Sequence, residues 1–273
     1  MEKHELALLE EKCKHTRRLI VDEIGKLGVG HIGGCLSVVE ALVVLYHKVM
    51  RIDPSNPQME GRDRFVMSKG HAGPALYAVL ADKGYFDVSE LDTLNKPETK
   101  LPSHCDMLKT RGVDMTAGSL GQGFSCAVGM AKASKIKKDN AYIYCIVGDG
   151  ESQEGQIWEA AMAAAHFKLN NLIAFTDNNK MQIDDVTENV LCVEPLHEKW
   201  KAFGWNVLRV NGHNVAEIYD AVMEGKKSAD KPTMIVLDTI KGKGVSFIEA
   251  MGVKNHSTNI SEEQRVAALK ELE

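Results

Sequence analysis

The fold is most clearly indicated by one stretch of the sequence, Tyr142-Ile143-Tyr144-Cys145-Ile146-Val147-Gly148-Asp149-Gly150. It is a short apolar run that ends in a carboxylate between two glycines. A continuous apolar run of this length is typical of a strand with both faces covered, as in a parallel sheet. After an Ala-rich segment, a second apolar run leads into Thr176-Asp177-Asn178-Asn179-Lys180-Met181, so Asn179 lies thirty residues beyond Asp149. This order of strand, helix and strand predicts that both residues leave the sheet at the same edge.

The same two patterns repeat along the rest of the chain. Apolar runs predict strands over 65–67, 141–147, 172–176, 206–210 and 234–238. Helical spacing predicts helices over 1–27, 37–50, 74–83, 124–137, 154–167, 214–227 and 262–272. Ser37 with Glu40, and Ser261 with Gln264, have the capping-box spacing that starts a helix. Nothing marks a linker, so we predict one α/β domain over residues 1–273, a doubly wound, mostly parallel sheet with helices on both faces.

The composition excludes several classes of protein. The chain has 273 residues and a net charge of −5, so it has no global basic field to attract nucleic acid or anionic lipid. Its six cysteines form no CxxC pair, which is typical of reduced thiols in a cytosol. The charged start is unlike a signal peptide, and no run approaches the roughly 18 apolar residues of a membrane span. We therefore expect a cytoplasmic protein that binds neither nucleic acid nor membrane.

The polar segments that follow the two strands, around Asp149 and Asn179, contain candidate metal ligands. A carboxylate from Asp149, an amide oxygen from Asn179 and a backbone carbonyl are hard ligands, and one charged ligand suits a Mg²⁺ that also takes phosphate oxygens. Gly-Asp-Gly alone is a common turn and Asn-Asn alone a common loop, but both together, each after its own strand, favour a metal-bound diphosphate. No GxGxxG dinucleotide fingerprint or GxxxxGK[ST] phosphate loop is present.

With three further blocks, these residues resemble transketolases, which use thiamin diphosphate. The blocks are Gly30-His31-Ile32-Gly33-Gly34, Asp63-Arg64-Phe65-Val66-Met67-Ser68-Lys69-Gly70-His71 and Thr116-Ala117-Gly118-Ser119-Leu120-Gly121-Gln122-Gly123. The resemblance covers about residues 12–257 and implies the diphosphate-binding (PP-type) domain alone. Family enzymes continue into a pyrimidine-binding domain, which supplies the glutamate that activates the cofactor, and a third domain. The resemblance therefore implies the N-terminal subunit of a split transketolase, which pairs with a separate C-terminal subunit in a heterodimer or α2β2 heterotetramer.

The resemblance also implies a function and roles for named residues. The enzyme would transfer a two-carbon ketol unit from a ketose phosphate, or a close analogue, to an aldose. Asp149, Asn179 and the main-chain oxygen of Met181 match the Mg²⁺ ligands. The positions that match cofactor contacts are His71, Gly118, Leu120, Gly150 and Asn179, with Glu154 and Glu159 matching carboxylates at the subunit interface. His31, His104 and His256 match histidines that line the substrate channel and assist proton transfer.

Some positions depart from the family pattern. Ile32 stands where the family usually has proline, Cys105 follows His104 where proline is usual, and Ser257 replaces the usual glycine-containing continuation after His256. Because these positions flank the channel, the donor could be an unusual ketose, such as a branched or sulfonated sugar. The basic segment Lys241-Gly242-Lys243-Gly244 could neutralise diphosphate, but a solvated turn is the expectation we favour.

Two other hypotheses stay open at the level of sequence. A metal-dependent hydrolase could use His31, His71 and His104 as ligands, although it would leave Asn178-Asn179 without a role and has no HExxH motif. A non-catalytic cofactor-binding or regulatory subunit is the third hypothesis. Tightly held zinc would indicate the hydrolase, and failure to become active with any partner would indicate the regulatory role.

Overall fold

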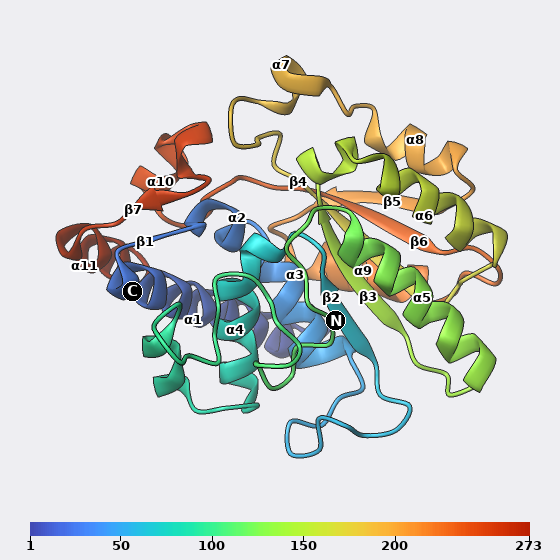
Figure 1. The fold of residues 1–273 in the computed structure, drawn as a ribbon, viewed down its shortest axis with the longest axis horizontal. Helices are drawn as coiled ribbons and strands as arrows, with labels where there is room; N and C mark the ends of the chain where they lie inside the picture. The colour runs from blue at the N-terminus through green and yellow to red at the C-terminus, as the bar shows by residue number, and fades with distance from the viewer.

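The computed structural model describes residues 1–273 and has a five-stranded parallel sheet at its centre (Figure 1). The strand order is β2-β3-β4-β6-β5, and every neighbouring pair is parallel. The strands are β2 (Arg64–Met67), β3 (Ile143–Gly148), β4 (Leu172–Asn178), β5 (Asn206–Asn211) and β6 (Thr233–Asp238). All five predicted strands are present, and the predicted α/β class with a parallel sheet is confirmed.

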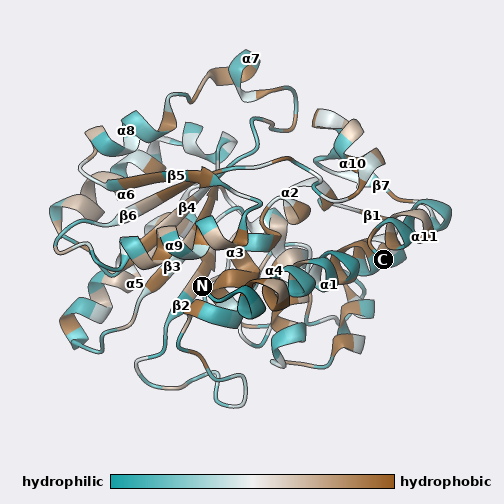
Figure 2. Cartoon of the chain, turned by 180° about the vertical axis from the view of Figure 1, so that it is seen from behind, coloured by the Kyte–Doolittle hydropathy of each residue, from teal (hydrophilic) through white to brown (hydrophobic).

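The central strands are apolar throughout because both of their faces are covered. Along β3, Tyr144 and Ile146 belong to a core of 47 buried residues, whereas Ile143, Cys145 and Val147 belong to a second core of 21. This alternation follows from the two-residue period of a strand. Helices α5 and α6 lie over one face of the sheet in Figure 1, while α3 and α9 come to the front in the reverse view of Figure 2, where the strands are predominantly hydrophobic.

The predicted helices are present, with shifts of a few residues at their ends. The long ones are α1 (Lys3–Leu27), α4 (Gly73–Lys83), α5 (Gln122–Lys137), α6 (Gly155–His166), α9 (Val215–Gly225) and α11 (Glu262–Glu271). Helix α11 begins with the predicted capping box of Ser261 and Gln264. The sequence patterns missed the short helices α2 (Ile32–Leu36), α7 (Thr187–Leu191), α8 (Leu196–Ala202) and α10 (Ser246–Ala250). No helix is long and apolar enough to cross a bilayer.

The predicted helix over 37–50 is wrong at its start. Helix α3 covers only Val39–Val44, begins after Val38 without a side-chain cap, and continues into a π-helix at Leu45–Val49. The Ser37 hydroxyl does not cap it: the helix begins one residue later, after Val38, and the hydroxyl donates to the carboxylate of Asp177 in the sheet, 2.7 Å away. A long-range polar contact thus replaces the local cap that the spacing predicted.

A second, two-stranded antiparallel sheet joins segments from opposite ends of the chain. It pairs β1 (Val29–Gly30) with β7 (Thr258–Asn259), and neither strand was predicted. Two residues are too few to give a periodic signal in the sequence. The small sheet matters for function because it places His31, which follows β1, next to His256, which precedes β7: their ring centroids lie 5.4 Å apart.

Candidate functional site

A cavity of about 360 Å³ opens at the carboxyl ends of β3 and β4, where a parallel sheet places its ligands. It brings together side chains and backbone from eight separate segments of the chain. The cavity lining includes every cofactor, metal and channel residue selected from the sequence: His31, His71, His104, Gly118, Leu120, Asp149, Gly150, Glu154, Asn179, Met181 and His256. Glu159 does not line it and is exposed on α6.

Asp149 and Asn179 lie side by side because their strands are neighbours. Gly148 pairs with Asp177 in the β3–β4 register, so the residues that follow meet at one edge. The Asp149 carboxylate accepts hydrogen bonds from the backbone N–H groups of Gly150 and Lys180. The Asn179 side-chain oxygen accepts from the backbone N–H of Met181, at 3.1 Å. The two predicted ligand side chains are therefore held in place by the backbone of the two loops.

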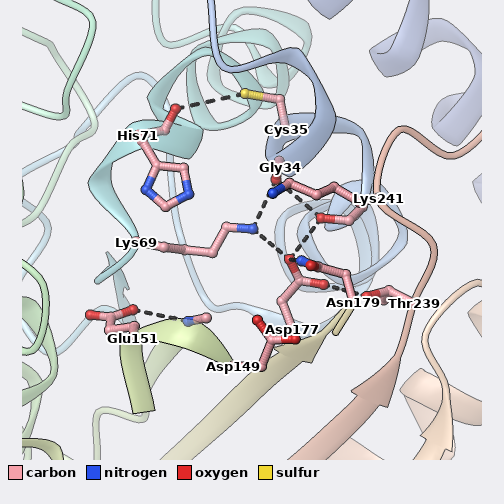
Figure 3. Close-up of polar contacts among 12 residues, drawn as sticks. Gly34, Cys35, Lys69, His71, Asp149, Glu151, Asp177, Asn179, Thr239 and Lys241 are labelled. Carbon is pink, nitrogen blue, oxygen red and sulfur yellow. Dashed lines mark hydrogen bonds and ion pairs between the residues drawn. The ribbon is translucent and has the colours of Figure 1, made fainter. Parts of the chain in front are cut away.

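A buried ion pair lies beneath the cavity, and one of its two members, Lys69, lines it. The Lys69 ammonium donates to the Asp177 carboxylate at 2.5 Å and to the Gly34 carbonyl at 2.9 Å, with both charged side chains at most 2% exposed. Asp177 also accepts from Asn179 at 2.9 Å, which fixes that amide (Figure 3). Figure 3 shows the Lys69 side chain reaching between His71 and Asp177. Neither Lys69 nor Asp177 was given a role from sequence, although both lie in the motifs that carry the resemblance.

The Glu151 side chain forms hydrogen bonds with three glycine-containing loops. Its carboxylate accepts from the Ser68 hydroxyl at 2.5 Å, from the Gly121 N–H at 2.8 Å and from the Gly148 N–H at 2.9 Å. The side chain is buried, and burial raises the pKa of Glu151 above its ordinary value. Removing this carboxylate would leave buried donors without partners, so its role is to position the loops that line the cavity.

Four histidines meet on the wall of the cavity, although they come from four different segments. The ring centroid of His31 lies 5.5 Å from that of His71, 5.6 Å from that of His104 and 5.4 Å from that of His256. Burial is the largest cause of a lowered pKa in all four, and the nearby lysines add to it for three of them. The pKa of His256 falls to about 3. At neutral pH these imidazoles are therefore uncharged, so each ring offers one hydrogen-bond donor and one acceptor.

Lys241 differs from the solvated basic turn that was predicted. It is only 3% exposed, lines the cavity, and donates to Nδ1 of His256 at 3.0 Å. Burial and the neighbouring Lys69 lower the pKa of Lys241 to about 8. The turn was predicted from its charges alone, but Gly242 (φ +89°) bends the backbone so that Lys241 faces inward. Lys243 is half-buried, 4.0 Å from Glu249.

The glycines and Leu120 complete the lining. A Cβ built on Gly118 would meet no heavy atom within 4 Å, so this backbone is open to a ligand. At Gly150 a Cβ would lie 3.1 Å from Cβ of Gln182, a contact so close that Gln182 would have to shift. Leu120 is 37% exposed, and Glu154 is exposed at the start of α6. An apolar side chain and bare backbone therefore line the cavity together with the charged groups.

The donor set at Asp149 and Asn179 fits a divalent cation with a diphosphate. Asp149 is 2% exposed and its hydrogen bonds come only from backbone N–H groups, whereas Lys69 neutralises Asp177. Burial and the negative charge of Asp177 raise the pKa of Asp149 to about 7. A cation at this carboxylate would favour its ionised form, and the buried Lys241, which pairs with no carboxylate, supplies positive charge for an anion.

The histidines do not form a metal site by themselves. The chain has no group of three or more His, Cys, Asp or Glu side chains that could hold a metal ion together. The hydrolase hypothesis needs such a group at His31, His71 and His104, and the geometry does not provide it. The site predicted at Asp149 contains one such side chain, with the other ligands an amide and a carbonyl, so this observation does not bear on it.

The lowered pKa of His256 predicts a pH-dependent stability. Between the ordinary value of 6.5 and the folded value of about 3, the unfolded chain binds a proton that the folded chain does not. The free energy of unfolding should therefore fall as pH drops through this window. Replacing His256 with glutamine should flatten that fall in urea titrations at several pH values, whereas replacing the exposed His166 should not. Equal slopes for wild type and H256Q would contradict the burial of an uncharged imidazole.

Comparisons with known proteins agree with the geometry. The family model described as "Transketolase, thiamine diphosphate binding domain" matches residues 9–272. The chain is 57% identical over 265 residues to the 6-deoxy-6-sulfo-D-fructose transketolase subunit SqwG of Clostridium sp. (strain MSTE9), covering 97% of this chain and 96% of the relative. It is 39% identical over 259 residues to an apulose-4-phosphate transketolase subunit of Phocaeicola vulgatus, covering 95% and 92%.

Solved structures give the same family but are much longer. Transketolase from Leishmania mexicana superposes with a TM-score of 0.90 at 30% identity, covering 97% of this chain and 41% of that one. Transketolase from Campylobacter jejuni gives a TM-score of 0.89 at 33% identity, covering 97% and 43%. The chain thus spans about two fifths of these enzymes and nearly the full length of relatives that are named as subunits. Its fold, its cavity and these matches together show that the chain belongs to the transketolase thiamin diphosphate-binding domain family.

Proposed function

We propose that this chain is the N-terminal subunit of a split transketolase, in which residues 1–273 form one diphosphate-binding domain. It would bind thiamin diphosphate and Mg²⁺, form a heterodimer or α2β2 heterotetramer with a separate C-terminal subunit, and work in the cytoplasm. The observation that carries the proposal is the convergence of Asp149, Asn179 and four uncharged histidines on one cavity. Relatives of the same length, named as transketolase subunits, support it.

The donor proposed is a sulfonated ketose. The 57% identical relative is named for 6-deoxy-6-sulfo-D-fructose, and the departures at Ile32, Cys105 and Ser257 flank the cavity histidines. The relatives named for apulose 4-phosphate, a different ketose, are 39% identical. We therefore propose transfer of a two-carbon ketol unit from 6-deoxy-6-sulfofructose to an aldose acceptor.

Each group in the cavity has a place in this proposal. When bound, the cofactor supplies the electron sink that stabilises the carbanion left by breaking a carbon–carbon bond. Asp149, Asn179 and the carbonyl of Met181 would hold Mg²⁺, and the backbone at Gly150 would approach the diphosphate. Lys241 would offset part of its negative charge. Gly118 and Leu120 would contact the aminopyrimidine ring, while Glu154 would lie at the interface between subunits.

The histidines would handle substrate and protons. His31, His104 and His256 would bind donor hydroxyl groups, and His71 would lie beside the cofactor. Burial lowers the pKa of each ring, so the imidazoles are uncharged at neutral pH and can donate and accept hydrogen bonds to the donor hydroxyl groups; His31 and His104 would move protons to and from them.

The chain alone should lack transketolase activity, because the glutamate that activates the cofactor is expected on the other subunit. Mixing it with the C-terminal subunit should raise the rate by about 10²-fold or more, the usual contribution of a general acid or base. The assay would compare 6-deoxy-6-sulfofructose, fructose 6-phosphate and apulose 4-phosphate as donors. Activity of the isolated chain would contradict the split enzyme, and no activity in any mixture would support a regulatory role. Preference for another donor would overturn only the substrate.

A further inference from the structure

We propose that Arg17, Glu40 and His213 form a network that positions Lys241 in the cofactor cavity by holding the loop 239–245 from outside. None of the three residues lines that cavity. They come from α1, α3 and the turn between β5 and α9, yet they meet at one place. The inference rests on the proposed function, because it assigns these residues an effect on thiamin diphosphate binding.

The network is buried and fully paired. Arg17 donates to one oxygen of Glu40 at 2.6 Å, and Nδ1 of His213 lies 3.2 Å from the other oxygen. The side chains of all three are at most 10% exposed. Burial raises the pKa of Glu40, but the hydrogen bond from His213 and the charge of Arg17 outweigh it and leave the pKa below its ordinary value. The carboxylate is therefore ionised and shared between two donors.

The backbone contacts fix the tautomer of His213. Nε2 of His213 lies 2.8 Å from the backbone nitrogen of Ile240. A backbone N–H can only donate, so Nε2 must be the unprotonated acceptor. The ring proton therefore sits on Nδ1, where it points to Glu40. His213 thus links the buried Glu40 carboxylate to the backbone of Ile240, the residue before Lys241.

Arg17 holds the other end of the same loop. Its Nε donates to the carbonyl of Lys243 at 3.0 Å. A Cβ built on Gly244, whose φ is +96°, would lie 2.9 Å from Cδ of Arg17, so the arginine stem packs directly on the turn. The network therefore forms hydrogen bonds with the loop backbone at Ile240 and at Lys243, on either side of the inward-facing Lys241.

The loop separates two hollows that share no residue. Lys241 lines the cofactor cavity, whereas Lys243 and Gly244 line a second hollow of about 270 Å³ together with the three network residues. The carbonyl of Lys241 is held from the inside by Asn255, at 3.1 Å. Lys241 itself has no carboxylate partner within 4.0 Å, so only the loop backbone and His256 fix its ammonium group. Loss of the outer network should therefore displace this charge.

The test is a double-mutant cycle on thiamin diphosphate affinity, measured by calorimetry on the assembled apo-enzyme with Mg²⁺. His213→Leu should weaken binding about 10-fold, the effect typical of residues that orient a ligand group. Combined with Lys241→Met, it should add little, because the group it positions is already gone. His213→Gln, which keeps one donor and one acceptor, should restore most of the affinity.

Control variants separate positioning from general damage. His47 contacts the buried carboxylate of Asp82 at 3.0 Å, as His213 contacts Glu40, but lies away from the cavity; His47→Leu is the matched control. If His213→Leu does not assemble, Arg17→Lys keeps a cation beside Glu40 but loses the paired Nε donor and should show the same coupling to Lys241. Equal weakening in the wild-type and Lys241→Met backgrounds, or no weakening, would overturn the network's role. Failure of the wild-type enzyme to bind thiamin diphosphate would instead overturn the proposed function.

Discussion

Replacing Asp149 with alanine should lower the turnover of the assembled enzyme by about 10³-fold, because residues that only orient metal ligands already cost about 10- to 100-fold when removed. Asp149 is the one charged side chain among the three proposed Mg²⁺ ligands, and its loss leaves an amide and a carbonyl. Steady-state rates and calorimetric titration with thiamin diphosphate would be measured with and without Mg²⁺. The affinity of the variant should no longer depend on Mg²⁺.

A control variant tests whether loss of any aspartate has this effect. Asp230 is exposed, and its carboxylate lies 3.8 Å from Lys168 on the surface. Asp230→Asn should leave both rate and affinity unchanged within about two-fold, because exposed ion pairs contribute little. An Asp149→Ala enzyme with near-normal turnover and a Mg²⁺-dependent cofactor affinity would contradict the assignment of the metal site.

Replacing Lys69 with methionine should destabilise the folded chain by about 3–5 kcal/mol, the usual cost of leaving one partner of a buried ion pair alone. Burial raises the pKa of Asp177, but the charge of Lys69 and the hydrogen bonds to the carboxylate outweigh it and leave the pKa below its ordinary value. Asp177 thus contributes stability above its unfolded pKa that is lost as pH falls through the lower folded value. Without Lys69 this contribution disappears.

Urea unfolding at several pH values measures this effect. The deficit of Lys69→Met should be largest near neutral pH and should shrink in acid, where the unpaired Asp177 takes up a proton. Lys168→Met removes an exposed lysine whose carboxylate partner is 3.8 Å away, and it should cost at most about 1 kcal/mol. A Lys69→Met deficit no larger than that of Lys168→Met would show that the ion pair does not stabilise the structure beneath the cavity.

The fold could be predicted because each strand is recognisable from its own short stretch of sequence. Runs such as 141–147 and 172–176 are apolar on both faces, and glycines or polar residues mark their ends. The positions of Asp149 and Asn179 then follow because the carboxyl ends of parallel strands lie at the same edge of the sheet. The four histidines came from resemblance to transketolases, because no spacing in the sequence shows that β1 and β7 pair.

The parts that could not be predicted depend on contacts far apart in the chain. The spacing of Ser37 and Glu40 predicts a capping box, yet Ser37 bonds to Asp177 and Glu40 to Arg17 and His213. Lys241 looks like a solvated charge until the loop's anchors are known. Ser37 and Glu40 bond to buried partners more than twenty residues away, and Lys241 faces a cavity. Local sequence propensity contains no information on such distant contacts or on the cavity.

In the proposed enzyme, the ends of β3 and β4 hold one divalent cation that binds the diphosphate of the cofactor. The most direct measurement is anomalous scattering from crystals of the assembled enzyme grown with thiamin diphosphate and Mn²⁺ in place of Mg²⁺. We expect a single strong peak bound by the Asp149 carboxylate, the Asn179 side-chain oxygen, the Met181 carbonyl and oxygens of the diphosphate. A cofactor seated in the cavity with no peak at these three residues, or with the metal held by the histidines, would contradict it.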